Sequence, residues 1–307
     1  MKGNLFLCFF VAILCLIFFL FPTFGQGVYI VQKKNVSSYE EIKNNFIQFS
    51  FVEQIPNLNT TAYYLDESEN DIAILKSIAE KNPTAIFTIG SYAAKKVREI
   101  MPNVTIIVAM VYYPESEKLD PNEKTIIISS LGSVKDLMEK VKDFRKIKKV
   151  GVMYNAQISE SANVFISELK SIGFEVTNFS FSSKEEIQSV CQDLKNRIQA
   201  LIVLPDQTTL NSDVIRYIVT ECISADVLPL SLNDRMVSSG YLIASHFSNE
   251  SIGKSAAIAT KEVATTGKNS SNKTRIPETS ETSLNKGTLK AFKLKISSNQ
   301  KIGVIYE

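Results

Sequence analysis

The sequence contains one histidine, His246, among its 307 residues. A histidine-based catalytic triad and a typical zinc site both need histidine together with further reactive or metal-binding side chains at set spacings, and no such spacing occurs. The glycine-rich motif of dinucleotide-binding enzymes and the serine elbow of hydrolases are also absent. We therefore predict that the protein is not an enzyme, that it uses no cofactor and no metal, and that His246 has a structural role.

Charge of one sign is also lacking. The 34 Lys and Arg residues nearly balance the 32 Asp and Glu residues, for a net charge of +2, and no basic stripe runs along the chain. This balance argues against nucleic acid as a partner. No short sequence period repeats, which argues against a solenoid or a propeller. With 45% hydrophobic and 21% charged residues, the chain has the composition of a globular protein.

Cysteine is scarce, and two of the four cysteines, Cys8 and Cys15, lie inside an apolar N-terminal stretch. Neither stands where the lipid-bearing cysteine of a lipoprotein is expected. The other two, Cys191 and Cys222, fall in segments with helical patterning. One disulfide between them is possible in an exported protein, but buried free cysteines are common in helices, and we predict two free thiols.

The first 26 residues have the pattern of a secretory signal. Lys2 precedes an uncharged apolar stretch from Leu5 to Phe21, and small residues follow near Thr23 and Gly25. We predict a signal peptide cleaved near Gly25, with an uncleaved N-terminal anchor as the alternative. In both cases the rest of the chain is exported to a periplasmic or extracytoplasmic location. Only an uncleaved segment would then touch the membrane.

From residue 28 onward, apolar strand-like runs alternate with helical patterns. The runs GVYIVQ, TAIFTIG and VTIIVAMVYYP are nearly continuous in apolar residues, as in sheets that are covered on both faces. The alternation restarts near Val134 and continues through KKVGVMYN, ALIVLP and VLPLSL. This pattern predicts an α/β fold made of two doubly wound lobes, each with a parallel sheet.

Short polar or aromatic side chains follow five of these strands. In open α/β sheets, ligands bind beyond the carboxyl ends of the strands. Local roles are the alternative, because serine and threonine often cap helices and tyrosine often packs between lobes. The candidate binding residues at these ends are Ser91, Tyr92, Tyr112, Tyr113, Ser159, Ser161, Asp206, Gln207, Thr208 and Asn233.

The order of these motifs resembles the substrate-binding proteins of ABC importers, specifically the family that includes tryptophan/tyrosine-type binding proteins. The resemblance extends from Ala79 to Leu294, and two departures stand out. Tyr113 occupies the place of the family's usual aspartate before proline, and TIIISSLGSV replaces a glycine-rich segment near the lobe crossover. The segments that carry the resemblance are IFTIGSYAAKKV, TIIVAMVYYPE, KKVGVMYNAQISESANVF, LPDQTTL, PLSLNDRMVSSGYLIA and ESIGKSAAIA.

The resemblance implies a type I periplasmic-binding fold whose two lobes close about a hinge. Residues 27–128 with about 249–275 would form lobe one, and residues 129–248 with about 276–307 would form lobe two. We expect a monomer that takes a small-molecule ligand and delivers it to an ABC permease. The alternative is a membrane-tethered module of the same fold that senses a ligand or presents a partner and is not coupled to transport.

The resemblance also implies roles for the candidate residues. Ser91 and Tyr92 would lie in the first-lobe half of the site, and Ser161 and the Asp206–Gln207–Thr208 turn in the second-lobe half. For an amino-acid-like ligand, Asp206 would bind the ammonium group, and hydroxyl and helix N–H groups at Ser91 or Ser161 would bind the carboxylate. Tyr112 or Tyr113 would pack on the ligand side chain.

Overall fold

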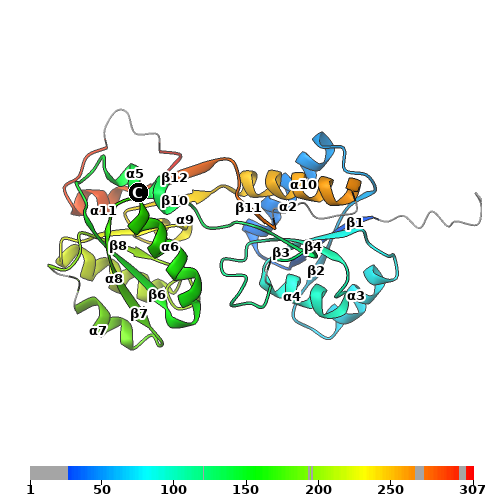
Figure 1. Cartoon of the computed structure of the whole chain (residues 1–307), viewed down its shortest axis with the longest axis horizontal. Coiled ribbons are helices and arrows are strands. Elements are labelled where there is room, and N and C mark those ends of the chain that lie inside the picture. The colour runs from blue at the N-terminus through cyan, green and yellow to red at the C-terminus, as the bar shows by residue number, and fades with distance from the viewer. Residues whose placement is uncertain (1–26, 120, 193, 195, 267–272, 297–301) are drawn as a thin grey trace, which may run out of the picture.

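The structure is a computed structural model that describes residues 27–119, 121–192, 194, 196–266, 273–296 and 302–307. The predicted signal segment, residues 1–26, lies outside them. Figure 1 shows two lobes side by side, each built on one sheet. Within the described residues no helix combines the length and the apolar character needed to cross a membrane.

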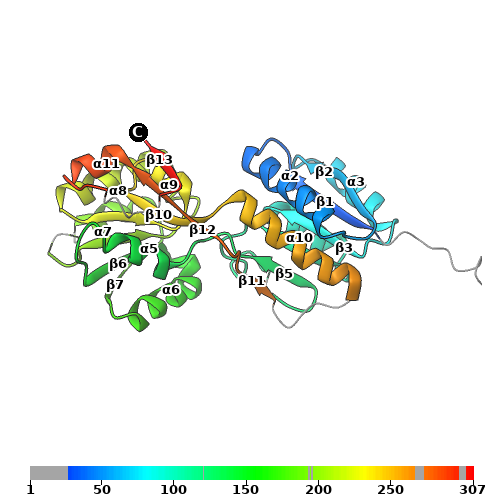
Figure 2. The ribbon, with the colours of Figure 1, turned by 90° about the horizontal axis from the view of Figure 1, so that it is seen from above.

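The first lobe has a six-stranded sheet in the order β11-β5-β4-β3-β1-β2, with every pairing parallel. Helices α2 and α10 lie side by side on one face (Figure 2), and α3 and α4 cover the other. Strands β3 and β4 are wholly buried because both faces are covered. The elements of this lobe are β1 (Val28–Lys33), α2 (Ser37–Val52), β2 (Leu58–Leu65), α3 (Asn70–Ala79), β3 (Ala85–Ile89), α4 (Ser91–Ile100), β4 (Thr105–Ala109), β5 (Thr125–Ile128), α10 (Asn249–Thr266) and β11 (Thr274–Arg275).

The second lobe has a seven-stranded sheet in the order β13-β12-β10-β9-β8-β6-β7. Strand β12 runs antiparallel to β10, and the other pairings are parallel, so the predicted α/β fold with two doubly wound lobes is confirmed apart from this edge. The elements are α5 (Val134–Val141), β6 (Lys149–Asn155), η1 (Ala156–Ile158), α6 (Ser159–Ser171), β7 (Glu175–Phe181), α7 (Glu186–Gln192), β8 (Ala200–Val203), α8 (Ser212–Ser224), β9 (Leu228–Ser231), α9 (Asp234–Ser238), β10 (Ile243–Phe247), β12 (Ser280–Asn285), α11 (Lys286–Ala291) and β13 (Val304–Tyr306).

The chain passes between the lobes three times, near residues 129–133, 247–249 and 276–279. The first passage touches the end of β10, from which the second passage continues, through the backbone. A Cβ atom placed on Gly132 would lie 1.9 Å from the carbonyl oxygen of Ser245. Glycine at position 132 therefore allows the two strands of the hinge to lie against each other.

Cys191 and Cys222 are free and buried in α7 and α8, as predicted. Burial raises the pKa of the Cys191 thiol to about 12. Both side chains belong to the apolar cluster on one face of the second sheet. They therefore act as small hydrophobic residues of the core.

Arg98 ties the end of α4 to the loops beneath it. Its guanidinium donates to the carbonyl oxygens of Pro102 (2.7 Å), Val104 (3.0 Å) and Lys124 (2.7 Å) and to the Thr125 hydroxyl (3.0 Å). We expect Arg98→Ala to lower the free energy of unfolding by about 2 kcal/mol, because several acceptors lose a charged donor at once. Urea denaturation of the two proteins measures this.

Lys96→Ala is the matched control, because it removes a cation from the same helix. Lys96 makes an exposed ion pair with Glu99 at 2.9 Å, and pairs of this kind contribute under about 1 kcal/mol. If Arg98→Ala shifts the urea midpoint no further than Lys96→Ala does, the guanidinium network does not stabilise the lobe.

Candidate functional site

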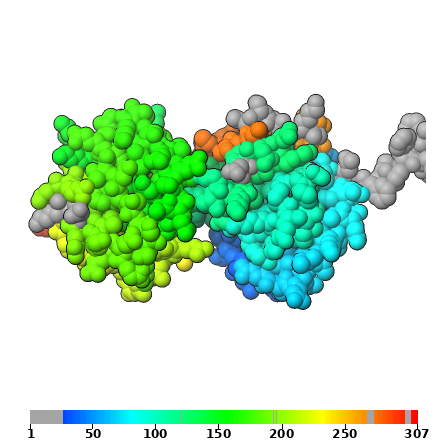
Figure 3. All heavy atoms as spheres, turned by 60° about the horizontal axis from the view of Figure 1, so that its bottom comes forward, coloured from blue at the N-terminus to red at the C-terminus, as the bar shows by residue number. Residues whose placement is uncertain are grey.

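The carboxyl ends of the two sheets face each other across the boundary between the lobes, which Figure 3 shows as a hollowed waist. A cavity of ≈ 810 Å³ lies there, within the size range of small-molecule sites. Side chains of both lobes line it. The lining includes Ser37, Ser38, Tyr39, Tyr112, Ser130, Asn233, Asp234, Arg235 and His246.

Tyr39, in the first turn of α2, places a phenol in the first-lobe wall of this cavity. Its hydroxyl lies against Gly90, at the start of α4, where an added Cβ would approach it to 2.5 Å. Gly90 also has a φ of 92°, which favours glycine. Burial raises the pKa of Tyr39, and the neighbouring Tyr112 adds to the shift. Tyr39 therefore lies beside Gly90, which follows β3, and near Tyr112, which follows β4.

Helix α2 begins at this wall without a side-chain cap, since the residue before it, Val36, makes no capping hydrogen bond through a side chain. Backbone N–H groups in a first helical turn lack partners inside the helix and favour an anion. A carboxylate in the cavity would meet such donors at the start of α2. The start of α4 also lacks a side-chain cap, but no residue of α4 lines the cavity.

Tyr112 joins the two lobes. Asn233, which follows β9, donates from Nδ2 to the Tyr112 hydroxyl at 2.8 Å. Burial raises the pKa of Tyr112, while this hydrogen bond and the charge of Arg235 act in the opposite direction. Two of the predicted residues, Tyr112 and Asn233, thus meet in the cavity across the boundary between the lobes.

Tyr113 points into the second lobe and not into the cavity. It is 6% exposed and packs in the apolar cluster of that lobe. Burial raises its pKa, and the charge of Asp206 contributes to the shift. The structure brings Tyr112 and Asn233 together in the cavity and buries Tyr113 in the second-lobe cluster.

The Asp206 turn is held by its own hydrogen bonds. The Asp206 carboxylate accepts from the Thr209 backbone N–H at 2.6 Å, and the Thr209 hydroxyl accepts from the Asp206 N–H at 2.7 Å. Thr209 also donates to the Leu204 carbonyl at 2.9 Å. Gln207 is exposed, and Thr208 is half-buried. Thr209, rather than Thr208, is the threonine that holds the turn.

Of the predicted residues, Tyr112 and Asn233 line the cavity. Those outside its lining are Ser91, Tyr92, Tyr113, Ser159, Ser161, Asp206, Gln207 and Thr208. Ser91 opens α4 half-buried, Ser161 is buried and Ser159 is exposed. Neither Ser159 nor Ser161 caps α6, which was the local alternative for them; Asn155 caps the short η1 turn instead. Tyr92 donates to the Asp71 carboxylate at 2.7 Å. Burial, followed by Asp71, raises its pKa to about 12.

Sequence reasoning missed Tyr39, Arg235 and the Asp234–His246 contact. Asp234 accepts from the Tyr306 hydroxyl and lies 3.6 Å from His246 Nε2. Tyr39 could have been found from its position in the chain, because it follows the carboxyl end of β1 as the other candidates follow their strands. His246 lies within β10, not after the strand.

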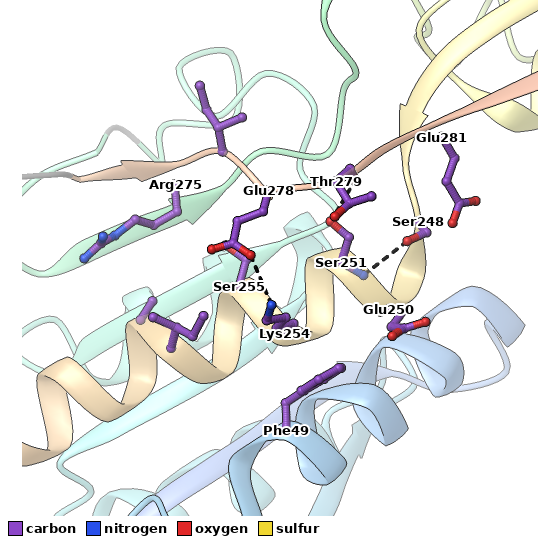
Figure 4. A pocket seen from close by; sticks show the side chains of 13 residues that line it. Phe49, Ser248, Glu250, Ser251, Lys254, Ser255, Arg275, Glu278, Thr279 and Glu281 are labelled. Carbon is purple, nitrogen blue, oxygen red and sulfur yellow. Dashed lines mark hydrogen bonds and ion pairs between the residues drawn. The ribbon is translucent and has the colours of Figure 1, made fainter. Parts of the chain in front are cut away.

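A second cavity, of ≈ 380 Å³, lies behind the hinge between α10 and the third passage (Figure 4). Its charged and polar groups bind one another. Lys254 pairs with Glu278 at 3.0 Å, and the Ser251 hydroxyl donates to the Thr279 carbonyl at 3.1 Å. These contacts fasten the passage to α10. In the described part of the chain, no group of three or more His, Cys, Asp or Glu side chains is placed to hold a metal ion.

Comparisons with known proteins agree with this arrangement. The family model described as ABC transporter substrate binding protein matches residues 51–305. No curated protein sequence matches the chain.

Two solved structures illustrate the shared fold. The ligand-free, open structure of CD0873, a substrate binding protein with adhesive properties from Clostridium difficile, has a TM-score of 0.71 at 18% identity over 92% of this chain and 99% of that one. The ABC domain in complex with L-Trp from Streptococcus pneumonia has a TM-score of 0.63 at 16% identity over 91% and 99%. At such identities the likeness shows the fold alone.

Proposed function

The chain belongs to the family of ABC transporter substrate-binding proteins, and from this premise we propose that it is an exported solute-binding protein. The predicted family and type I periplasmic-binding fold are confirmed. The proposal is that the two lobes close on a small polar, amino-acid-like ligand and deliver it to an ABC permease outside the cytoplasm. The observation that carries it is the cavity to which both lobes contribute polar side chains.

The cavity offers complementary groups for such a ligand. The uncapped start of α2, with the Tyr39 hydroxyl beside it, suits a carboxylate. Arg235 on the opposite wall adds a positive charge. Asp206, at the second-lobe rim, remains the candidate for the ammonium group when the lobes close. Tyr112 supplies an aromatic face for the rest of the ligand.

Family membership supports binding, not turnover. We propose that the protein is not an enzyme, because the groups at the boundary suit recognition and lack an evident pairing of nucleophile and base. A membrane-tethered sensor of the same fold would bind its ligand in the same way. Permease and ATPase genes beside this one would support transport, whereas a kinase or receptor gene would support sensing.

The binding proposal predicts the behaviour of Asn233→Ala. Removing the amide leaves the Tyr112 hydroxyl without its hydrogen-bond donor, and we expect about tenfold weaker binding, equivalent to the loss of a hydrogen bond near 1.4 kcal/mol. The measurement is a thermal-shift titration of the exported chain with individual amino acids and small polar solutes.

Ser238→Ala is a matched control, because Ser238 lies on the same short helix and its exposed hydroxyl donates only to the Arg235 carbonyl within that helix. It should leave the affinity within twofold of wild type. Equal affinity in wild type and Asn233→Ala would contradict the assignment of this boundary as the ligand site.

A further inference from the structure

Tyr113 lies on a segment that the first lobe holds. Residues 110–119 follow β4, and Val111 and Leu119 are buried in the cluster beneath α4. Glu117 forms an ion pair with Lys95 of α4. The backbone around Tyr113 is therefore fixed to the first lobe on both sides.

The ring of Tyr113 nevertheless lies in the second lobe. It belongs to the apolar cluster that contains Tyr154, Ile158, Leu204 and Leu232, which lie at or just beyond the carboxyl ends of β6, β8 and β9. These ends form the second-lobe half of the cleft, where ligands of open α/β sheets bind. A side chain carried by the first lobe is thus buried in the second lobe's cluster, close to the strand ends where a ligand group would bind.

Hydrogen bonding does not explain this placement. Across the described residues, the buried Tyr113 hydroxyl finds no hydrogen-bond partner. A buried hydroxyl without a partner opposes the arrangement, so apolar burial of the ring must favour it. By contrast, Tyr112 satisfies its hydroxyl through Asn233 and borders the open cavity.

We infer that Tyr113 is a built-in occupant of the second-lobe half of the cleft and determines ligand size. It excludes ligands with a large aromatic side chain and leaves the space between Tyr39, Tyr112 and Asn233 for a small polar one. This inference rests on the proposed solute-binding function and narrows its ligand class to small, non-aromatic, amino-acid-like molecules.

The test compares wild type, Tyr113→Ala and Tyr113→Phe by calorimetric titration with L-tyrosine, L-tryptophan, L-serine and L-alanine. Tyr113→Ala should bind an aromatic amino acid at least tenfold more tightly than wild type does. Tyr113→Phe keeps the ring and should behave as wild type. In wild type, both aromatic amino acids should bind more weakly than the better of the two small ones.

A second probe does not depend on the natural ligand. The molecule 4-methylphenol reproduces the missing side chain, and it should raise the Tm of Tyr113→Ala but not that of wild type. L-tyrosine should compete with it, because the vacated space opens to the cleft. Tyr241→Ala serves as control, since Tyr241 is wholly buried in the other apolar cluster of the second lobe; L-tyrosine should not compete there.

Tight binding of L-tryptophan or L-tyrosine by wild type would overturn the inference, as would equal stabilisation of wild type and Tyr113→Ala by 4-methylphenol. If Tyr113→Ala does not fold, Tyr113→Leu replaces it. The preference of wild type for small over aromatic amino acids tests the inference in either case. If 4-methylphenol binds as expected while no amino acid or small solute binds any variant, the result supports Tyr113 as the side chain that fills this space and contradicts the proposed ligand class.

Discussion

Replacing Gly132 by alanine is expected to destabilise the protein by about 3 kcal/mol or more, the largest effect on stability among the changes considered. The added Cβ would lie 1.9 Å from the Ser245 carbonyl oxygen and 2.4 Å from its carbonyl carbon. Both are backbone atoms of β10, so no side chain can rotate away. Relief requires the first two passages between the lobes to separate, and thermal and urea unfolding would measure the cost.

Gly303→Ala is the matched control. The nearest atom to its added Cβ is 3.6 Å away, an ordinary contact, so stability should stay within about 0.5 kcal/mol of wild type. A Gly132→Ala protein as stable as Gly303→Ala would mean that the two passages are not packed backbone to backbone. The hinge would then not rest on this backbone contact.

Changing Asp206 to asparagine is expected to weaken ligand binding 10- to 100-fold, because a charged hydrogen bond contributes about 1.5–3 kcal/mol. Asparagine keeps a side-chain oxygen for the Thr209 N–H, so the turn and the Tm of the free protein should change little. Calorimetric titration with the best ligand of the thermal-shift screen measures the affinity.

Thr209→Val tests the opposite half of the turn. It removes the hydroxyl that bonds Asp206 N–H and the Leu204 carbonyl but keeps the carboxylate. We expect a lower Tm with ligand affinity retained within about threefold, since two buried backbone groups lose a partner. Wild-type affinity in Asp206→Asn would show that Asp206 serves only its own turn.

The sequence predicted the architecture because burial dictates its pattern. Strands such as Ala85–Ile89 and Thr105–Ala109 are covered on both faces and read as unbroken apolar runs. The antiparallel β12 could not be recognised in this way. SETSLN is largely polar, and only its partner β10 and the C-terminal β13 determine its direction.

The site was less predictable than the fold. Strand ends identified Tyr112 and Asn233, whose side chains meet across the boundary between the lobes, because topology brings such ends together. Which way a side chain turns depends on tertiary packing. Tyr112 and Tyr113 are adjacent in sequence, yet one lines the cavity and the other is buried in the opposite lobe. Tyr92 likewise turns to Asp71 in the first turn of α3, and no local pattern reveals that partner.

Binding of one small solute between the two lobes can be observed by native mass spectrometry of the purified exported chain, incubated with pooled amino acids and small polar solutes. We expect a 1:1 complex with a single non-aromatic solute, strongly reduced in Asp206→Asn and in Asn233→Ala. Recovery of only the free protein under these conditions, or equal retention of the solute by wild type and both variants, would show that the lobes do not hold a solute in this way.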